Sequence, residues 1–416
     1  MTFREVLSIA PVRRLWLAQL VSVFGDFLAI FAVFSVATFR LHANAAQISL
    51  ILVAFMLPLA IVSPLAGVLV DRWNLKRTMI TSDLLRALVA SGLLFATRLE
   101  HFYAIFLAMS AVSAFFVPAQ SVTVRLLVPA AGLMTANALM AQAMQVTQIV
   151  TPAIAGIMVD TVGPMVAYAF DVCSFLFSAY MVWGVSVHRE PQTGRSLSVV
   201  HHDMTDGLKF IFTHSAVSFV MIAMTVGMFA IRCFGALMAV YVRDILSATS
   251  SLFGLLNSMV GLGMIIATQF IHRAGRNKPK KNLVVFGLLV AGCFIGFLAA
   301  IGTVPTTFLG MLGLGFGVAF VFIPAQTLLQ QVTPMAMLGR VTSALMSSLA
   351  VTQVAALTLS GSLAQTIGIR NLYFASAALL VLLATVGYRQ LSSKSSAETS
   401  EVSPVGTEVP ISEHHS

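Results

Sequence analysis

Long apolar stretches recur along this chain from near its N-terminus to residue 389, and they constrain its fold more than any other feature. Each has roughly 20 to 25 residues, enough for a helix to cross the ~30 Å hydrocarbon core of a bilayer. Only 9% of the 416 residues are charged and 58% are hydrophobic, which excludes a soluble globular protein. We therefore predict an all-α polytopic membrane protein with twelve transmembrane helices. They are expected at about 15–39, 47–70, 78–97, 102–124, 137–159, 164–187, 216–241, 251–271, 282–301, 304–328, 341–365 and 370–389.

The basic residues are distributed unevenly about these stretches. The net charge of +9 could indicate nucleic-acid binding, but most of the 24 lysines and arginines fall on the side that holds the N-terminus. The opposite side holds only Arg40, Arg98, Arg243 and Arg370. This asymmetry is the positive-inside pattern of membrane proteins. We expect a multi-pass protein of the plasma (inner) membrane with both termini cytoplasmic, and no nucleic-acid partner.

The sequence offers little for metal, cofactor or enzyme chemistry. Cys173, Cys233 and Cys293 fall within predicted helices without metal-ligand spacing. The polar segment 201–203, His-His-Asp, is typical of an exposed loop, with a metal site as the alternative. No Gly-x-x-x-x-Gly-Lys-Ser/Thr loop is present to bind ATP, and no histidine falls within a helix core to serve an intramembrane enzyme. We predict no metal, no cofactor and no enzymatic activity.

An internal repeat divides the chain. Residues 116–121, Phe-Val-Pro-Ala-Gln-Ser, recur as 322–327, Phe-Ile-Pro-Ala-Gln-Thr, at an offset of about 206, and further matches in register indicate two homologous halves. Those matches include Gly156, Thr161 and Gly163 with Gly361, Thr366 and Gly368. We predict an N-terminal six-helix bundle at 1–187, a cytoplasmic linker at 188–215, a C-terminal six-helix bundle at 216–390 and a disordered cytoplasmic tail at 391–416.

A charged elbow at residues 67–77 ends one predicted helix and begins the next. Gly67 would let a neighbouring helix approach closely, while Asp71 and Arg72 could meet a facing helix N-terminus and a partner carboxylate. The pattern Gly-x-x-x-Asp-Arg-x-x-x-Lys-Arg, ending at Arg77, resembles the signature loop between helices 2 and 3 of the major facilitator superfamily. Asn74 stands where that family usually has glycine, and asparagine also adopts a left-handed turn.

The resemblance implies the major facilitator fold, with two pseudo-symmetric six-helix bundles and the substrate held between them. It also implies that Gly67, Asp71, Arg72 and Arg77 form a latch between the two halves on the cytoplasmic side.

Several further segments resemble one branch of the superfamily, which holds macrolide-type efflux pumps and the third drug:proton antiporter family. They are 82–87, 118–119, 170–175, 207–210 and 339–341. Of the antiporter motif in the fifth helix, only Pro152 and Gly156 remain.

This branch implies proton-coupled export of a small amphipathic molecule, such as a drug, an antibiotic or a siderophore-like metabolite, by alternating access. A facilitator of lysophospholipids or other lipids without proton coupling is the alternative. We expect a monomer that works with its substrate, protons and the lipid bilayer.

Asp26 is the leading candidate for a transport residue. It lies near the middle of the first predicted helix, where a carboxylate is costly and therefore functional or paired. Gln19, Ser22 and Asp26 share one helix face, which in the resembled fold lines the central cavity. We predict that Asp26 is the proton-linked or substrate-facing acid, with a structural polar pair as the alternative.

Four other charges fall within predicted helices or beside them. Asp83 and Arg86 are spaced to pair with each other or with the elbow charges, so we interpret them as structural. Asp171 is on a helix that is peripheral in the resembled fold, and we expect it to bond within its own half. Arg232 is about 206 residues after Asp26, so we predict an ion pair between these two across the cavity, with bonding of Arg232 inside its own half as the alternative. Further polar groups on cavity or interface helices include Gln120 and Gln326.

Overall fold

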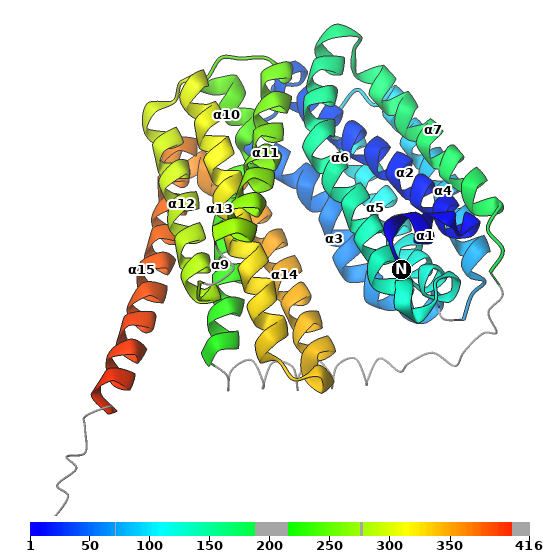
Figure 1. Cartoon of the computed structure of the whole chain (residues 1–416). Coiled ribbons are helices and arrows are strands. Elements are labelled where there is room, and N and C mark those ends of the chain that lie inside the picture. Colours follow the sequence, from blue (N-terminus) through cyan, green and yellow to red (C-terminus); the bar gives the residue numbers. More distant parts are fainter. Residues whose placement is uncertain (71, 188–214, 275–277, 402–416) are drawn as a thin grey trace, which may run out of the picture.

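The computed structural model describes residues 1–70, 72–187, 215–274 and 278–401, and this part of the chain is helical without strands (Figure 1). Its first long helices are α2 (Ala10–Ser35), α3 (Ala45–Val70), α4 (Leu75–Ser91), α5 (Leu99–Leu127), α6 (Leu133–Thr161) and α7 (Pro164–Trp183). The later long helices are α9 (Ser215–Ala236), α11 (Ser250–Ala274), α12 (Lys280–Ile301), α13 (Val304–Val332), α14 (Met335–Ile367) and α15 (Ile369–Glu401). The short elements are α1 (Phe3–Ser8), a π-helical turn η1 (Val36–Arg40), η2 (Gly92–Phe95), η3 (Ala130–Gly132) and α10 (Met238–Asp244).

Within the described residues, 11 helices are long and apolar enough to cross a membrane, whereas the sequence predicted twelve spans. The span predicted at 137–159 corresponds to α6, which has 29 residues but is not one of the 11. Its apolar run is interrupted by Asn137, Gln142, Gln145 and Gln148. The all-α membrane fold is confirmed, and a twelfth span at α6 remains a prediction.

The internal repeat has a counterpart in the backbone. Pro118 in α5 and Pro324 in α13 both lie inside a helix. Gly163 separates α6 from α7 with φ 91°, and Gly368 separates α14 from α15 with φ 84°. Glycine adopts such positive φ values without steric strain, so the same residue type sets the turn in both halves.

The long helices form two groups, which lie side by side in Figure 1. Helices α2 to α7 pack mainly against one another and are called the N-half; α9 to α15 do the same and are called the C-half. The halves meet where α6 packs against α11 and α3 packs against α14. Small residues allow these approaches, since a Cβ atom on Gly156 would lie 2.6 Å from the Ser250 carbonyl oxygen.

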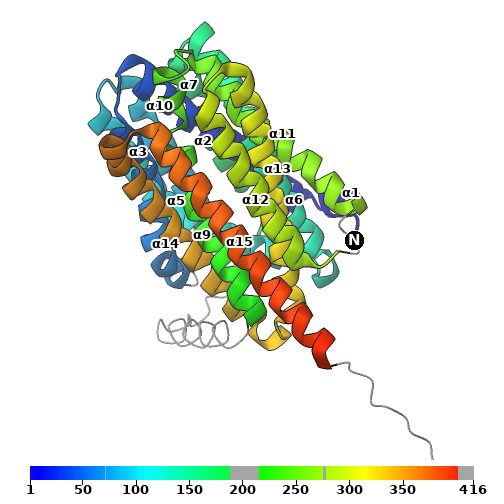
Figure 2. The same ribbon diagram turned by 90° about the vertical axis from the view of Figure 1, so that its left-hand side faces the viewer.

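The ends of the predicted domains are only partly described. The sequence predicted a disordered tail from residue 391, whereas α15 runs to Glu401 and extends beyond the neighbouring helices (Figure 2). Most of the predicted linker, residues 188–214, and residues 402–416 lie outside the described part of the chain. The domain boundaries therefore remain predictions.

Candidate functional site

Hydrogen bonds join the two halves at one end of the molecule, which we call the closed end. Asp160 of α6 accepts hydrogen bonds from the Ser251 backbone N–H at 2.7 Å and from the Ser251 hydroxyl at 2.5 Å. Arg243 of α10 donates to the carbonyl oxygens of Thr38 and Ala43, at 2.8 Å each. Both sets of bonds cross from one half to the other, so they must break before this end can open.

The motif remnant of the fifth predicted helix also lies at this interface. Pro152 and Gly156 are buried where α6 faces α11. Ser258 of α11 accepts a hydrogen bond from the Ala153 backbone N–H at 3.2 Å, directly after the proline. A proline inside a helix disturbs the backbone ladder, and here the opposite half supplies a partner. Pro152 and Gly156 therefore lie in the contact between the halves.

The opposite end of the halves carries the elbow. A Cβ atom on Gly67 would meet nothing within 4 Å, so the close helix approach expected at this glycine is absent. Asp71 lies outside the described residues, and Arg72 and Arg77 are exposed. Asn74 caps α4 with extended backbone geometry, φ −72°, and accepts a hydrogen bond from the Arg77 N–H at 3.0 Å. It therefore acts as a helix cap rather than as the left-handed turn that the sequence suggested.

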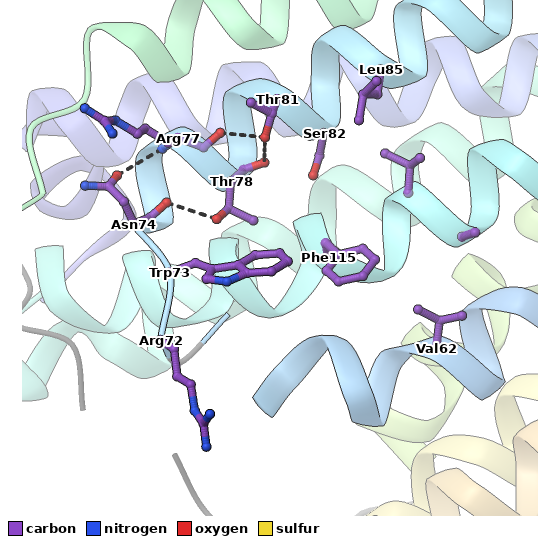
Figure 3. Close-up of a pocket in the computed structure, with 12 residues that line it drawn as sticks. Val62, Arg72, Trp73, Asn74, Arg77, Thr78, Thr81, Ser82, Leu85 and Phe115 are labelled. Atoms are coloured by element: carbon purple, nitrogen blue, oxygen red, sulfur yellow. Dashed lines mark hydrogen bonds between the residues drawn. The ribbon is translucent and has the colours of Figure 1, made fainter. Parts of the chain in front are cut away.

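A pocket of about 680 Å³ adjoins the elbow between α3, α4 and α5 (Figure 3). Trp73 stacks on Phe115 there, with ring centroids 5.8 Å apart. Arg72 and Arg77 line this pocket, and it lies within the N-half. Arg72 and Arg77 are thus placed on the N-half in this conformation.

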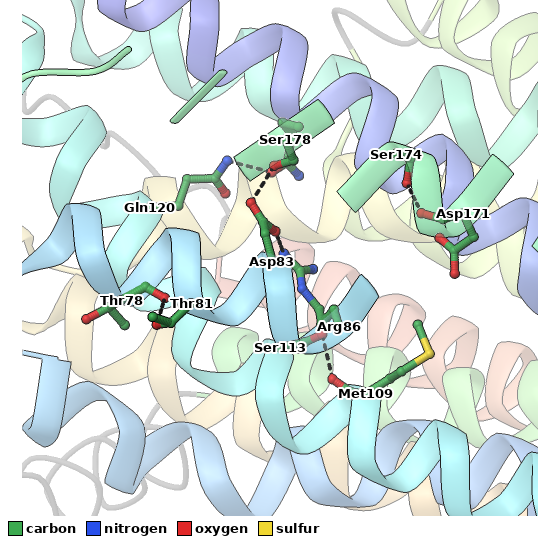
Figure 4. Close-up of polar contacts among 11 residues, drawn as sticks. Thr78, Thr81, Asp83, Arg86, Met109, Ser113, Gln120, Asp171, Ser174 and Ser178 are labelled. Atoms are coloured by element: carbon green, nitrogen blue, oxygen red, sulfur yellow. Dashed lines mark hydrogen bonds and ion pairs between the residues drawn. The ribbon is translucent and has the colours of Figure 1, made fainter. Parts of the chain in front are cut away.

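Asp83 and Arg86 form a buried ion pair on α4, as their spacing predicted. Ser178 of α7 donates to the second carboxylate oxygen of Asp83 at 2.7 Å (Figure 4). The Arg86 guanidinium carbon lies 4.4 Å from the Phe116 ring centre and 4.5 Å from that of Phe175. Two aromatic faces, a carboxylate and a hydroxyl therefore stabilise this pair between α4, α5 and α7.

Asp171 of α7 is fully buried, and neither of its carboxylate oxygens has a hydrogen-bond partner in the described structure. It lies against α2, since a Cβ atom on Gly25 would be 2.9 Å from its Oδ1. Asp26 follows Gly25 and is half-buried. Asp171 interacts electrostatically with Asp26 and Arg86. Asp171 thus has its neighbours within its own half, among them the leading candidate acid, and the bond expected there is not formed among the described residues.

Asp26, Asp83, Asp171 and Arg86 thus form one group, which we call the acid cluster. Arg86 pairs with Asp83 and also acts electrostatically on Asp26 and Asp171, so one guanidinium faces three carboxyl groups inside the N-half. Full ionisation would leave two uncompensated negative charges at membrane depth, which is costly. The cluster is therefore suited to hold at least one proton.

Amide side chains extend the polar face of α2. Gln120 of α5 donates to Gln19 Oε1 at 2.6 Å, and Ser22 is buried on the same face. Gln19, Ser22 and Asp26 lie on α2 at the spacing of one helix face, and Gln120 is bonded to Gln19; that this face lines the cavity remains a prediction. Gln326 of α13 is exposed in the other half.

Arg232 does not pair with Asp26 in this conformation. The cation that acts electrostatically on Asp26 is Arg86. Arg232, on α9, has an exposed side chain that is nevertheless surrounded by other parts of the protein. It forms no ion pair within the described ranges. The cation beside Asp26 is Arg86 because α4 and α2 both pack against α7, a neighbourhood that spacing in the sequence does not reveal.

The fold and these buried charges define a multi-pass membrane protein with two packed helix groups. The chain belongs to the Major Facilitator Superfamily, whose family model matches residues 15–356 and 220–412. It is a transporter of that superfamily, as the elbow motif indicated.

Relatives from bacteria match most of the chain. An uncharacterised transporter of this type from Bacillus subtilis, YfiS, is 25% identical and covers 89% of this chain and 90% of its own. Macrolide efflux protein A of Streptococcus pyogenes is 23% identical over 89% of this chain and 94% of its own. A putative bacilysin exporter of Bacillus subtilis, BacE, is 26% identical over 48% of this chain and 50% of its own.

Solved structures share the fold. The nucleoside transporter NupG has a TM-score of 0.73 at 12% identity and covers 91% of this chain and 99% of its own. A POT family transporter in complex with 5-aminolevulinic acid has a TM-score of 0.71 at 12% identity, over 90% of this chain and 94% of its own. At this identity these structures show the fold alone; the family model makes the chain a transporter, with efflux proteins among its relatives.

Proposed function

We propose that this protein exports a small amphipathic molecule in exchange for protons, by alternating access. The observation that carries the proposal is the acid cluster of the N-half, in which Arg86 pairs with Asp83 and acts electrostatically on Asp26 and Asp171. A transport step that protonates or deprotonates such a cluster changes its net charge. A change of charge shifts the equilibrium between the two conformations of an alternating-access protein.

Substrate recognition is assigned to polar groups on helices that line the central cavity, or the interface beside it, in the resembled fold. Asp26, Gln19 and Gln120 come from the N-half, and Arg232 and Gln326 from the C-half. Arg232 is a cation without an ion-pair partner among the described residues, so it favours a polar or negatively charged part of the substrate. The apolar side chains around these groups suit the rest of an amphipathic molecule.

The membrane orientation that fits this function places both termini in the cytoplasm of a cell bounded by a plasma (inner) membrane. The closed end would then face outward and the elbow inward. This assignment makes the structure an inward-open state of a monomer, in which Arg72 and Arg77 are exposed on their own half. The names of the relatives, an efflux protein for macrolides and an exporter for bacilysin, support the outward direction.

The test is transport by the purified protein in liposomes with an imposed pH gradient and a radiolabelled macrolide as the probe. Proton exchange predicts accumulation of the macrolide on the acidic side and its collapse when a protonophore removes the gradient. Transport of a labelled lysophospholipid that ignores the gradient would favour the lipid facilitator instead. A gradient-independent flux of both probes would refute proton coupling.

A further inference from the structure

Asp171 is a buried carboxyl group. Proton exchange at Asp26 alone does not explain its role. Asp83, another acid of the cluster, is bound by Arg86 and Ser178. Asp171 is equally buried, yet neither of its carboxylate oxygens is hydrogen-bonded in the described structure. An ionised carboxylate is stable in the membrane interior only when it is paired. Asp171 therefore carries a proton in this conformation.

The Asp171 carboxyl group packs directly against α2 at Gly25. Gly25 lacks the side chain that would collide with it, because a Cβ atom there would lie 2.9 Å from Asp171 Oδ1. The Ser174 hydroxyl, one turn further along α7, donates to the Asp171 backbone carbonyl at 2.7 Å and not to the carboxylate. The carboxyl group is thus left free of local donors, a condition that favours its neutral form.

The charged groups around α7 come from three helices. α2 contributes Asp26, and Arg14 of α2 reaches the Gly184 carbonyl beyond the far end of α7. α4 contributes Arg86 and, through Ser178, Asp83. α6 has one acid, Asp160, which is bound to Ser251 at the closed end. On α7 itself the Tyr168 hydroxyl is buried without a partner in the described structure, and the packed turn η2 has no ionisable side chain.

We propose that Asp171 is a second proton-binding residue of the transport cycle and exchanges its proton with Asp26. This inference rests on the proton-coupled export proposed above. Asp26 keeps some exposed surface, whereas Asp171 has none. Asp26 is the entry and exit of the proton, and Asp171 holds it while the halves move.

The transfer is balanced in atoms and charge. The O–H bond of the Asp171 carboxylic acid breaks, an O–H bond forms on the Asp26 carboxylate, and the pair keeps one negative charge throughout. Arg86 provides a fixed positive charge beside both acids. The substrate then meets a protonated Asp26, and release of that proton to solvent completes the exchange.

The first test needs no substrate. Infrared difference spectra of the full-length protein in lipid nanodiscs, recorded as pH is changed, report protonated carboxyl groups by their C=O stretch. We expect Asp171→Asn to remove a carboxylic acid band that the wild type retains at neutral pH, and to alter the titration of the band lost in Asp26→Asn. Ser174→Ala, one turn away, is the matched control and should leave both bands in place. An unchanged acid band in correctly folded Asp171→Asn would overturn the proposal.

The second test is transport of the labelled macrolide in liposomes. A gradient of one pH unit supports about tenfold accumulation when one proton exchanges for one neutral molecule. We expect this ratio for the wild type and Ser174→Ala, and a ratio of about one for Asp171→Asn, with substrate-for-substrate exchange retained. Tenfold accumulation by Asp171→Asn would overturn the relay alone. Absence of accumulation in the wild type would instead refute the proposed function.

Discussion

Asp160 at the end of α6 accepts two hydrogen bonds from Ser251 at the start of α11, one from the backbone N–H and one from the hydroxyl. The carboxylate lies at a helix N-terminus, where negative charge is favoured. Because α6 and α11 belong to different halves, a helix cap here serves as a bond between them. The closed end is therefore held by polar contacts that a conformational change can exchange for contacts with water.

Removal of the Asp160 carboxylate should open this end more often. A lost helix cap costs about 0.5–2 kcal/mol, so Asp160→Ala should shift the equilibrium between conformations by roughly 2- to 30-fold. The distance distribution between spin labels at Leu41→Cys and Thr249→Cys measures this shift. Thr161→Ala is the matched control, since the Thr161 hydroxyl bonds only to Ile157 in its own helix. Identical distributions for Asp160→Ala and the wild type would contradict the assigned role.

Arg243 should act in the same direction through its geometry rather than its charge. Its Nη1 donates to the carbonyl oxygens of Thr38 and Ala43 while its Nε and Nη2 bind the Asp244 carboxylate, and lysine cannot reproduce this use of a planar guanidinium fork. We expect Arg243→Lys to populate the open form of this end several-fold more than the wild type, as measured by the same labels. The exposed Arg98, changed to lysine, is the control, and equal effects of both substitutions would argue against the contact.

Two glycines should respond differently to an added methyl group. Gly156→Ala places a Cβ 2.6 Å from the Ser250 carbonyl oxygen and should destabilise the closed end, lowering the midpoint of thermal unfolding. Gly67 has open space around it here, so Gly67→Ala should retain or raise that midpoint. Helix propensity alone would add up to about 1 kcal/mol to the free energy of unfolding. If the elbow serves as a latch in the other conformation, Gly67→Ala should still slow transport. Normal transport rates in Gly67→Ala would contradict a close helix approach at Gly67 in the other conformation.

The elbow charges should affect conformational cycling more than substrate affinity. Arg72 is exposed and lies on its own half, away from Asp26 and Gln120. We expect Arg72→Ala to lower the maximal transport rate with little change in the substrate concentration that gives half of it. A weakened affinity with an unchanged maximal rate would place Arg72 in substrate binding instead.

The buried pair on α4 should be important for stability. Arg86→Met removes a charge that sits between Phe116 and Phe175 and leaves Asp83 unpaired, a change that typically costs about 3–5 kcal/mol. We expect lower yield and a lower unfolding midpoint for Arg86→Met, and partial recovery in the double variant with Asp83→Asn. The exposed Arg125→Met is the control. A stable Arg86→Met protein would contradict the structural role of the pair.

The repeat and the helical spacing made several of these features predictable. The turn glycines Gly163 and Gly368 were visible as matched positions, and the pair of Asp83 with Arg86 followed from their separation on one helix. The neighbours of Asp171 were not predictable, because they depend on which helices pack together. The contacts of Arg243 were also hidden, since backbone carbonyls are acceptors at every residue and leave no mark in the sequence.

The predicted pair of Asp26 with Arg232 shows the limit of the repeat. The offset correctly linked the prolines of α5 and α13, but Asp26 has Arg86 as its neighbouring cation. A repeat relates positions within two halves and does not specify the distance between the halves, which changes during alternating access. An ion pair of Asp26 with Arg232 in another conformation remains a prediction.

The proton dependence of transport by Asp26→Asn tests the central claim most directly. Proteoliposomes with wild-type or Asp26→Asn protein would be given a pH gradient of one unit, and macrolide accumulation would be followed together with internal pH. We expect the wild type to accumulate the probe up to about tenfold while it dissipates the gradient, and Asp26→Asn to reach a ratio of about one while it still exchanges labelled for unlabelled probe. Accumulation by Asp26→Asn equal to that of the wild type would contradict the account.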